Sequence, residues 1–452
     1  MTFRIVQVAT KDLLAKGIDM GAFDQIIGYT AVKQRLERTA DVLAHPDAYR
    51  QLGARPPRAM LLYGEPGVGK TLMARCLIEA SGRASVVCRK DEPNGEFVKV
   101  IKKKFKKAAE KAPSILLLDD MDKFANEDSC HRDAEEYVTV QSCLDELAQS
   151  GAEVFVLATA NDTSHLPYSL MRSGRLGTKI EVECPSGADA EAILSHYLAG
   201  KKMVDDIDPA FLARVLGGNS CATLEEVANE AGLLAGYDRS ETITQEHFMK
   251  AVLSTVHGIP EAVIDMSKME SAATQKCLYT AYHEAGHVVV SEIIDPGSTT
   301  LATVFRKRKS RFGGFVLSQH SDANLVKMQQ AKILVSLGSK AAQEQKFGIM
   351  DSGAESDLAD AFGHVKELVE DSCCCGFNLY RDGYGASEDL KSRIEQAVAA
   401  EIERYYRKAK ETLSANIDFL DAVANSLLEK GILTMHDIAK IKETCDILSV
   451  PM

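Results

Sequence analysis

The sequence predicts a multidomain protein, in which an α/β P-loop domain with a helical lid precedes a mainly α-helical domain. Three observations lead to this prediction. Residues 64–71 read GEPGVGKT, apolar runs alternate with helical stretches around that motif, and residues 283–287 read HEAGH. The chain has 452 residues, more than one hydrophobic core usually covers, so several domains are expected.

The α/β domain is predicted from short apolar runs that end in polar residues. Three runs read as buried strands: 57–63, 114–120 and 153–162. Helical stretches alternate with them: 70–81, 98–112 and roughly 133–149. Such alternation is typical of a doubly wound sheet, which binds its ligand at the carboxyl ends of the strands.

Five segments follow from this pattern. The sequence pattern of residues 186–258 is helical throughout and predicts a small helical lid. Helices are expected to dominate again in the last domain. The expected segments are an N-terminal tail at 1–21, the α/β core at 22–185, the lid at 186–258, a linker at 259–271 and the last domain at 272–452.

Composition narrows the class of protein. The 45% hydrophobic and 26% charged residues are those of an ordinary soluble protein, and the net charge of −12 argues against nucleic-acid binding. Eleven cysteines without paired spacing favour free thiols in a reducing cytoplasm. Because no apolar stretch is long enough to span a bilayer and no signal peptide is present, we expect a cytoplasmic protein without a membrane span. A longer, membrane-anchored form remains compatible with the sequence.

The GEPGVGKT motif has the spacing of a phosphate-binding loop between a strand and a helix. Gly64, Gly67 and Gly69 let backbone N–H groups surround phosphate oxygens. Lys70 would neutralise the β- and γ-phosphates of ATP, and the Thr71 hydroxyl would hold Mg²⁺. The alternative is a glycine turn with a helix-capping threonine. The other loop positions expected at the nucleotide are Glu65, Pro66, Val68 and Leu72.

Polar residues at the ends of the next two strands are candidates for ATP hydrolysis. Asp119 ends an apolar strand, where it can reach the metal through water, and Asp120 stands where an acid would polarise the attacking water. Asn161 either orients the same water or is a plain turn residue. Arg172 and Arg175 suit either surface charges or arginine fingers that reach the γ-phosphate of a neighbouring subunit.

The HEAGH motif predicts a metal site. His283 and His287 are four residues apart and share one helix face, with Glu284 beside them to take a proton from water. The alternative is a solvent-facing helix with incidental histidines, which the apolar neighbours in AYHEAGHVVV disfavour. A catalytic zinc site needs a third ligand. Spacing leaves it open among Glu344, Asp351, Glu355, Asp357, Asp360 and His364.

The motifs in this order resemble a known family. The stretch from FDQIIGYTAVKQRLE through GEPGVGKT, LLLDD, LATAND and SLMRSGR is similar to the ATPase module of AAA+ proteins, and with HEAGH it resembles the FtsH-type ATP-dependent zinc proteases. The resemblance implies that Ile27 and Gly28 lie near the adenine, beneath the lid segment 218–226. It also implies a hexameric ring, homo-hexameric or mixed, with Arg172 and Arg175 as fingers in trans.

The same resemblance completes the metal site. DSGAESDLADA looks like the segment that carries the family's aspartate ligand, which makes Asp357 the third ligand of a catalytic Zn²⁺. Glu344, in KAAQEQKFG, matches a glutamate near the metal and is the second choice. The last domain is then a zinc metallopeptidase domain with Glu284 as general base. A hairpin expected at 301–318, with GGFV at 313–316, either offers an edge strand to a peptide or is a plain surface hairpin.

The chain departs from the family pattern at three points. Family members carry glutamate where Asp120 stands, so we expect slow ATP turnover with nearly normal nucleotide binding. The substrate-gripping pore loop falls near 93–95 without an aromatic residue, unless Phe97 serves instead. The membrane anchor is missing from this chain.

We therefore expect an ATP-dependent zinc endopeptidase that hydrolyses ATP in a hexameric ring to unfold and degrade polypeptides. One alternative is a zinc peptidase whose weak ATPase half binds nucleotide mainly for ring assembly. The other is a non-proteolytic AAA+ remodeller.

Overall fold

A computed structural model describes residues 20–91, 96–125, 134–172, 174–264, 275–306, 313–319, 325–348, 354–379 and 387–449. The chain divides into two compact units, Met1–Gln245 and Glu246–Met452, which are described separately. Four sequence predictions lie outside the described residues: most of the N-terminal tail, most of the linker, the pore-loop positions 93–95 and the candidate ligand Asp351.

Unit 1 contains a parallel sheet of five strands in the order β2-β3-β4-β1-β5. The strands are β1 (Ala59–Tyr63), β2 (Ala84–Cys88), β3 (Ser114–Leu118), β4 (Val154–Ala160) and β5 (Thr178–Glu181). The three central strands are those predicted from continuous apolar runs. The two edge strands were missed because they are short and partly exposed, so their sequences alternate with polar residues.

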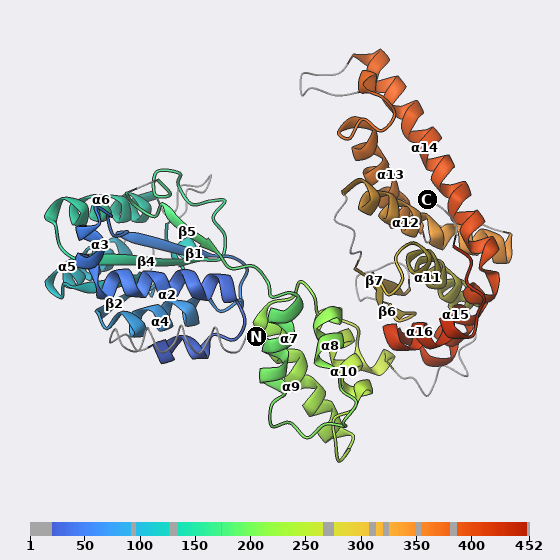
Figure 1. The fold of residues 1–452 in the computed structure, drawn as a ribbon, viewed down its shortest axis with the longest axis horizontal. Helices are drawn as coiled ribbons and strands as arrows, with labels where there is room; N and C mark the ends of the chain where they lie inside the picture. Colours follow the sequence, from blue (N-terminus) through green and yellow to red (C-terminus); the bar gives the residue numbers. More distant parts are fainter. Residues whose placement is uncertain are drawn as a thin grey trace. The chain divides into compact units, whose positions relative to one another are not determined.

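Helices cover both faces of this sheet, as Figure 1 shows. Helices α5 (Phe97–Glu110) and α6 (Ala134–Ser150) pack together on one face, over a buried cluster that includes Leu61 and Leu116. Helices α2 (Thr30–Ala44) and α4 (Lys70–Ser81) also pack together. The predicted doubly wound α/β fold is thereby confirmed.

Phe97 belongs to this core and does not project from a loop. Its side chain is fully buried at the start of α5 and meets the ring of Phe124 edge-on, with the ring centroids 5.1 Å apart. The prediction that Phe97 could grip a substrate is therefore wrong for this fold, because exposing the ring would cost about 1.5–3 kcal/mol of burial energy.

The remaining elements of unit 1 are helical. They are the 3-10 helices η1 (Met20–Gln25) and η2 (Met121–Lys123), and the α-helices α3 (Pro46–Gln51), α7 (Gly187–Leu198), α8 (Pro209–Val215) and α9 (Cys221–Tyr237). Helices α7 and α9 pack on each other within the segment predicted as a helical lid.

Unit 2 is mainly α-helical, as predicted. Its helices are α10 (Gln245–Ala251), η3 (Val252–Val256), η4 (Glu261–Val263), α11 (Gln275–Ile294), α12 (Leu325–Phe347), α13 (Glu355–Glu370), η7 (Phe377–Leu379), α14 (Glu388–Ala415), α15 (Ile417–Lys430) and α16 (Met435–Glu443). Helix α12 packs against α11, α13 and α14, so it lies at the centre of the hydrophobic core of this unit (Figure 1).

A three-stranded antiparallel sheet accompanies these helices, in the order β7-β6-β8. Strands β6 (Thr299–Thr303) and β7 (Phe315–Ser318) form the predicted hairpin. Strand β8 (Ile432–Thr434) was not predicted, because it has only three residues and follows closely on α15. Strand β7 therefore lies at one edge of this sheet.

Helices α11 and α12 cross at two glycines. A Cβ atom on Gly286 would lie 2.4 Å from the backbone oxygen of Gly338, and one on Gly338 would lie 2.8 Å from that of Gly286. Only residues without a side chain allow this approach. The HEAGH motif, which contains Gly286, is therefore held directly against the backbone of α12.

Among the described residues, no helix combines the length and the apolar character that crossing a bilayer requires.

Candidate nucleotide and metal sites

The GEPGVGKT loop joins β1 to α4 at the carboxyl end of the sheet. Gly64, Gly67 and Gly69 all have positive φ angles, of 147°, 83° and 97°. A Cβ atom on Gly64 would lie 2.0 Å from the backbone oxygen of Val182, so this position admits only glycine. Lys70 is buried and donates to the backbone oxygens of Gly64 and Glu65 at 2.8 and 2.7 Å. The loop has the backbone shape that surrounds a phosphate.

Asp119 lies beside Thr71 at this edge of the sheet. The hydroxyls of Thr71 and Thr159 donate to its Oδ1 atom at 3.2 and 2.9 Å. A threonine hydroxyl paired with a strand-end aspartate is the arrangement that holds Mg²⁺ next to a phosphate loop. Thr159 was not among the predicted site residues: it lies inside β4, in the LATAND stretch, of which only Asn161 was singled out.

Asp120 is restrained by two cations. Its backbone has a positive φ of 53°, and its carboxylate pairs with Arg89 at 3.1 Å and with Lys123 at 2.8 Å. Burial favours the neutral acid, but hydrogen bonds from Lys123 and Arg89 outweigh it and lower the pKa of Asp120. Asn161 follows β4, next in chain to Ala160, whose backbone oxygen accepts from the Gly64 N–H at 3.3 Å.

The two arginines of the RSGR segment differ in their surroundings. Arg175 makes a two-pronged pair with Asp145, at 2.9 and 2.6 Å, and also donates to the backbone oxygen of Ser169 at 2.6 Å. Arg172 is exposed. The structure thus ties Arg175 to its own chain and leaves the Arg172 side chain on the surface.

A pocket of about 230 Å³ adjoins the phosphate loop. Its lining includes Ile27, Val68 and Leu72, which the sequence analysis had assigned to the nucleotide, together with residues of α7 and α9. Gly28, the neighbour of Ile27, packs closely on Asp189: a Cβ atom there would lie 3.1 Å from that carboxylate.

The start of α9 closes one side of this pocket. The Ala222 N–H donates to the backbone oxygen of Gly67 at 3.1 Å, which ties the predicted lid segment to the phosphate loop. Tyr29 lies against the same helix: its hydroxyl is 3.4 Å from the Cys221 sulfur and donates to the Glu183 backbone oxygen at 3.0 Å. Tyr29 lies in the stretch FDQIIGYTAVKQRLE and Cys221 in the lid segment 218–226, but neither was singled out from the sequence, because packing brings them together.

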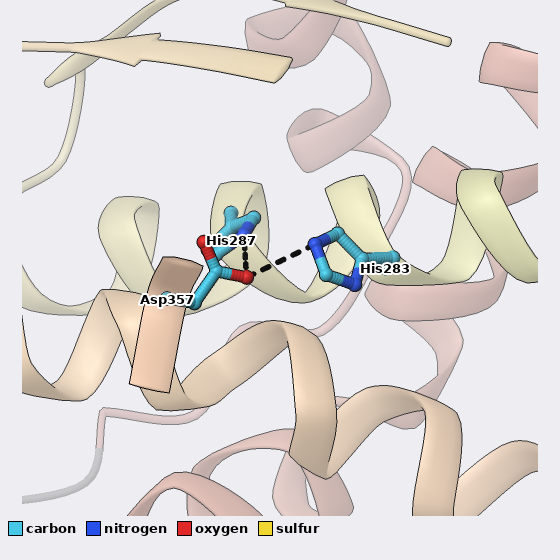
Figure 2. Close-up of side chains that lie close together, drawn as sticks. All are labelled: His283, His287 and Asp357. Atoms are coloured by element: carbon cyan, nitrogen blue, oxygen red, sulfur yellow. Dashed lines mark ion pairs between the residues drawn. The ribbon is translucent and has the colours of Figure 1, made fainter. Parts of the chain in front are cut away.

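Three predicted metal ligands converge in unit 2. Helix α11 presents both imidazoles on one face, and α13 brings the carboxylate of Asp357 to them (Figure 2). The Oδ2 atom of Asp357 lies 3.1 Å from Nε2 of His283 and 3.3 Å from Nε2 of His287. One ligand atom from each residue lies within 4.8 Å of the others. Two imidazoles and one carboxylate are the donor set of a catalytic zinc site with an open position, so the residues fit this metal.

Two groups of this cluster carry a charge. Burial opposes protonation of both imidazoles and prevails at His283, whose pKa is lowered. At His287 the hydrogen bond to Asp357 outweighs burial and raises the pKa to about 9, so this imidazole is protonated at neutral pH. Burial also opposes ionisation of Asp357, but its two histidine partners lower its pKa. Without a metal the charged carboxylate therefore pairs with a protonated His287, which loses this proton when it holds a metal cation.

The other candidates for third ligand lie elsewhere. The carboxylate of Glu344 accepts a hydrogen bond from the Tyr406 hydroxyl, and its Oε1 atom lies 3.5 Å from Nζ of Lys410. Glu355 and Asp360 are exposed on α13, and His364 pairs with Glu367 at 3.5 Å.

Glu284 is buried beside the two histidines on α11. A Cβ atom on Gly314 would lie 2.3 Å from its Oε1 atom, so the backbone just before β7 touches this carboxylate. Gly314 has a positive φ of 83°, which suits a glycine at the start of the strand. An edge strand therefore begins directly at the predicted general base.

Known families match both halves of the chain. Residues 60–184 match the "ATPase family associated with various cellular activities (AAA)", and residues 270–441 match "Peptidase family M41". The two matches coincide with the phosphate-loop sheet and with the histidine–aspartate cluster.

Curated relatives extend over most of the chain. "ATP-dependent zinc metalloprotease FtsH 2" of Sphaerobacter thermophilus is 30% identical over 428 residues, which are 90% of this chain and 64% of the relative. The protein of the same name in Symbiobacterium thermophilum is 29% identical, over 95% of this chain and 76% of the relative. "ATP-dependent zinc metalloprotease FtsH" of Parabacteroides distasonis is 28% identical, over 93% of this chain and 64% of the relative. The chain thus spans less than two thirds of the first and third of these relatives.

Proposed function

We propose that this chain is an ATP-dependent zinc endopeptidase. It joins an AAA ATPase domain to a Peptidase family M41 domain and is homologous to FtsH zinc metalloproteases. The observation that carries the proposal is the convergence of His283, His287 and Asp357 in a chain that also has a complete phosphate loop.

His283, His287 and Asp357 would hold the zinc ion. When bound, zinc supplies Lewis-acid polarisation of the scissile peptide carbonyl. Glu284, buried beside the histidines, accepts a proton from the attacking water and returns it to the leaving amine nitrogen. Because Gly314 brings the backbone to Glu284, an extended polypeptide that pairs with β7, an edge strand of the described sheet, would pass beside this base.

The phosphate loop would hold ATP with Mg²⁺. Lys70 would contact the β- and γ-phosphates, the Thr71 hydroxyl and Asp119 would hold the metal, and Asp120 and Asn161 would orient the attacking water. The pocket lined by Ile27 and Leu72 takes the adenosine.

We further propose that the ATPase domains form a homo-hexameric ring, with mixed rings as a variant. In such a ring Arg172 is the finger that reaches a neighbour's γ-phosphate, because its side chain is exposed. Arg175 would hold the RSGR segment, and so Arg172, in place through its ion pair with Asp145 of the same chain. The substrates are unfolded or tagged polypeptides of the cytoplasm, a compartment that suits the free cysteines among the described residues.

A protease assay of Glu284→Gln tests the proposal. Wild-type protein should cleave casein, and the variant should lose activity by about 10²–10⁴-fold because it lacks the general base. Both proteins should bind one zinc ion, since Glu284 is not a ligand. A chelator should abolish wild-type cleavage. Cleavage that survives both the chelator and Glu284→Gln would contradict the proposed metal chemistry.

One observation favours a second candidate function, a zinc peptidase whose ATPase half serves mainly for assembly. Arg89 and Lys123 both pair with Asp120, which weakens this acid as a base. If a non-hydrolysable ATP analogue supports casein cleavage as fully as ATP does, and a folded substrate survives with both nucleotides, the second candidate is correct. Absence of stoichiometric zinc would instead favour a non-proteolytic AAA+ remodeller.

A further inference from the structure

Helix α12 contributes polar groups at an unusual place, the buried face that meets the metal cluster. Most of its buried residues are apolar or glycine, as expected in a core. The two polar exceptions are Ser339, which is fully buried, and Gln343, which is 2% exposed. Burying a polar group without a partner costs free energy, so each needs a partner in this core.

The partner of Ser339 is the carboxylate of Asp357. Its hydroxyl lies 2.9 Å from the Oδ2 atom, the same oxygen that both imidazoles approach. The hydroxyl also lies 3.1 Å from the backbone oxygen of Ser336. It has only one proton, and a charged carboxylate is the stronger acceptor.

Val335 and Gln343 lie one helical turn to either side of Ser339. The Val335 backbone oxygen lies 2.7 Å from Nδ1 of His287. The other ring nitrogen, Nε2, is the one that approaches Asp357. The Gln343 amide nitrogen donates to the Tyr279 backbone oxygen at 3.2 Å. Its buried amide oxygen has no hydrogen-bond partner within 3.5 Å in the described part of the chain.

The spacing of Val335 and Ser339 explains how one helix serves two ligands. Positions 335 and 339 are four residues apart and therefore lie along one face of α12. The close crossing of Gly286 and Gly338 brings that face to the HEAGH helix.

We propose that α12 positions two of the zinc ligands: the Val335 carbonyl orients His287, and the Ser339 hydroxyl orients Asp357. This inference rests on the proposed zinc site. Ser339 is a positioning residue: it acts through the ligand and touches neither metal nor substrate. Such partners fix the orientation of a ligand before the metal arrives, and losing one typically costs about 10–100-fold in metal affinity.

Zinc affinity of the full chain, measured by competition with a chromophoric chelator, tests the inference without reference to activity. Ser339→Ala should weaken zinc binding by about 10–100-fold. Ser336→Ala is the matched control: it makes the same chemical change one turn away, at a half-buried side chain, and should leave the affinity unchanged. Thermal unfolding of the metal-free proteins reports whether each variant folds.

A double-mutant cycle separates positioning from general packing. In an Asp357→Ala background, Ser339→Ala should cause no further loss of zinc affinity, because its only route to the metal is gone. Equal zinc affinity of wild type and Ser339→Ala, with both proteins folded, overturns the inference while leaving the zinc site intact. Failure of the wild type to bind zinc overturns the proposed function itself, and this inference with it.

Discussion

Asp119 and Asp120 follow each other at the end of β3 but have different surroundings. Asp119 is buried and accepts hydrogen bonds from two threonine hydroxyls, the environment of a metal-holding acid. Asp120 faces Arg89 and Lys123, whose hydrogen bonds outweigh burial and lower its pKa. Proton acceptance becomes less favourable as the pKa of a base falls below the working pH. Both its length and its partners therefore make Asp120 a poor catalytic base.

We predict that ATP turnover by the wild type is slow and that Asp120→Glu accelerates it. The added methylene moves the carboxylate toward the nucleotide, and a displacement of about 1 Å can change a rate by on the order of 10²-fold. Steady-state ATPase assays measure the change. Asp120→Asn should abolish turnover, while nucleotide affinity should be similar in all three proteins. Vigorous wild-type turnover that Asp120→Asn leaves unaltered would contradict this assignment.

At the scale of elements, the crossing of α11 and α12 determines the geometry of the metal cluster. Gly286 lies between the two histidines of the motif and touches the backbone oxygen of Gly338. Any side chain at either position separates the helices. The His287 ring would then move away from the Val335 carbonyl, which lies 2.7 Å from its Nδ1 atom.

Gly338→Ala should therefore destabilise the metal-free protein by about 1–3 kcal/mol, because a Cβ atom there would meet backbone and Val290 at 2.8 Å. Gly363→Ala is the control, since a Cβ atom at this helical glycine of α13 meets nothing within 4 Å. The control should gain about 0.5–1 kcal/mol from the loss of glycine flexibility. Chemical denaturation with a chelator present measures both changes. Equal effects of the two substitutions would show that the crossing tolerates a methyl group.

At the scale of the whole molecule, nucleotide and metal chemistry are carried by separate compact units of one chain. Peptide hydrolysis by the zinc cluster needs no ATP as a reactant. Coupling between the units should therefore be visible only with substrates that must first be unfolded.

We predict that casein, which is already flexible, is cleaved with ATP or with a non-hydrolysable analogue, and that a stably folded substrate is degraded only with ATP. The reason is that unfolding requires work from hydrolysis, whereas binding alone is enough to assemble a ring. Gel-based degradation assays with the two nucleotides measure the difference. Degradation of the folded substrate with the analogue would contradict the prediction that unfolding requires ATP hydrolysis.

The sequence by itself determined what depends on neighbouring residues. The glycine spacing of GEPGVGKT predicts the phosphate loop, and the spacing of His283 and His287 puts both rings on one helix face, because local backbone geometry fixes these relations. Continuous apolar runs likewise predicted the three buried central strands. Resemblance to a family, and not spacing, was needed to single out Asp357.

Only the tertiary structure decided which distant residues become partners. Phe97 proved to be core, Arg175 is tied to Asp145, and Ser339 meets Asp357 across two helices. None of these relations has a signature in the sequence, because burial and pairing at long range arise from how whole helices and strands pack. The two glycines at the α11–α12 crossing illustrate the reason: each is unremarkable in the sequence, and only their contact brings the metal ligands and their partners together.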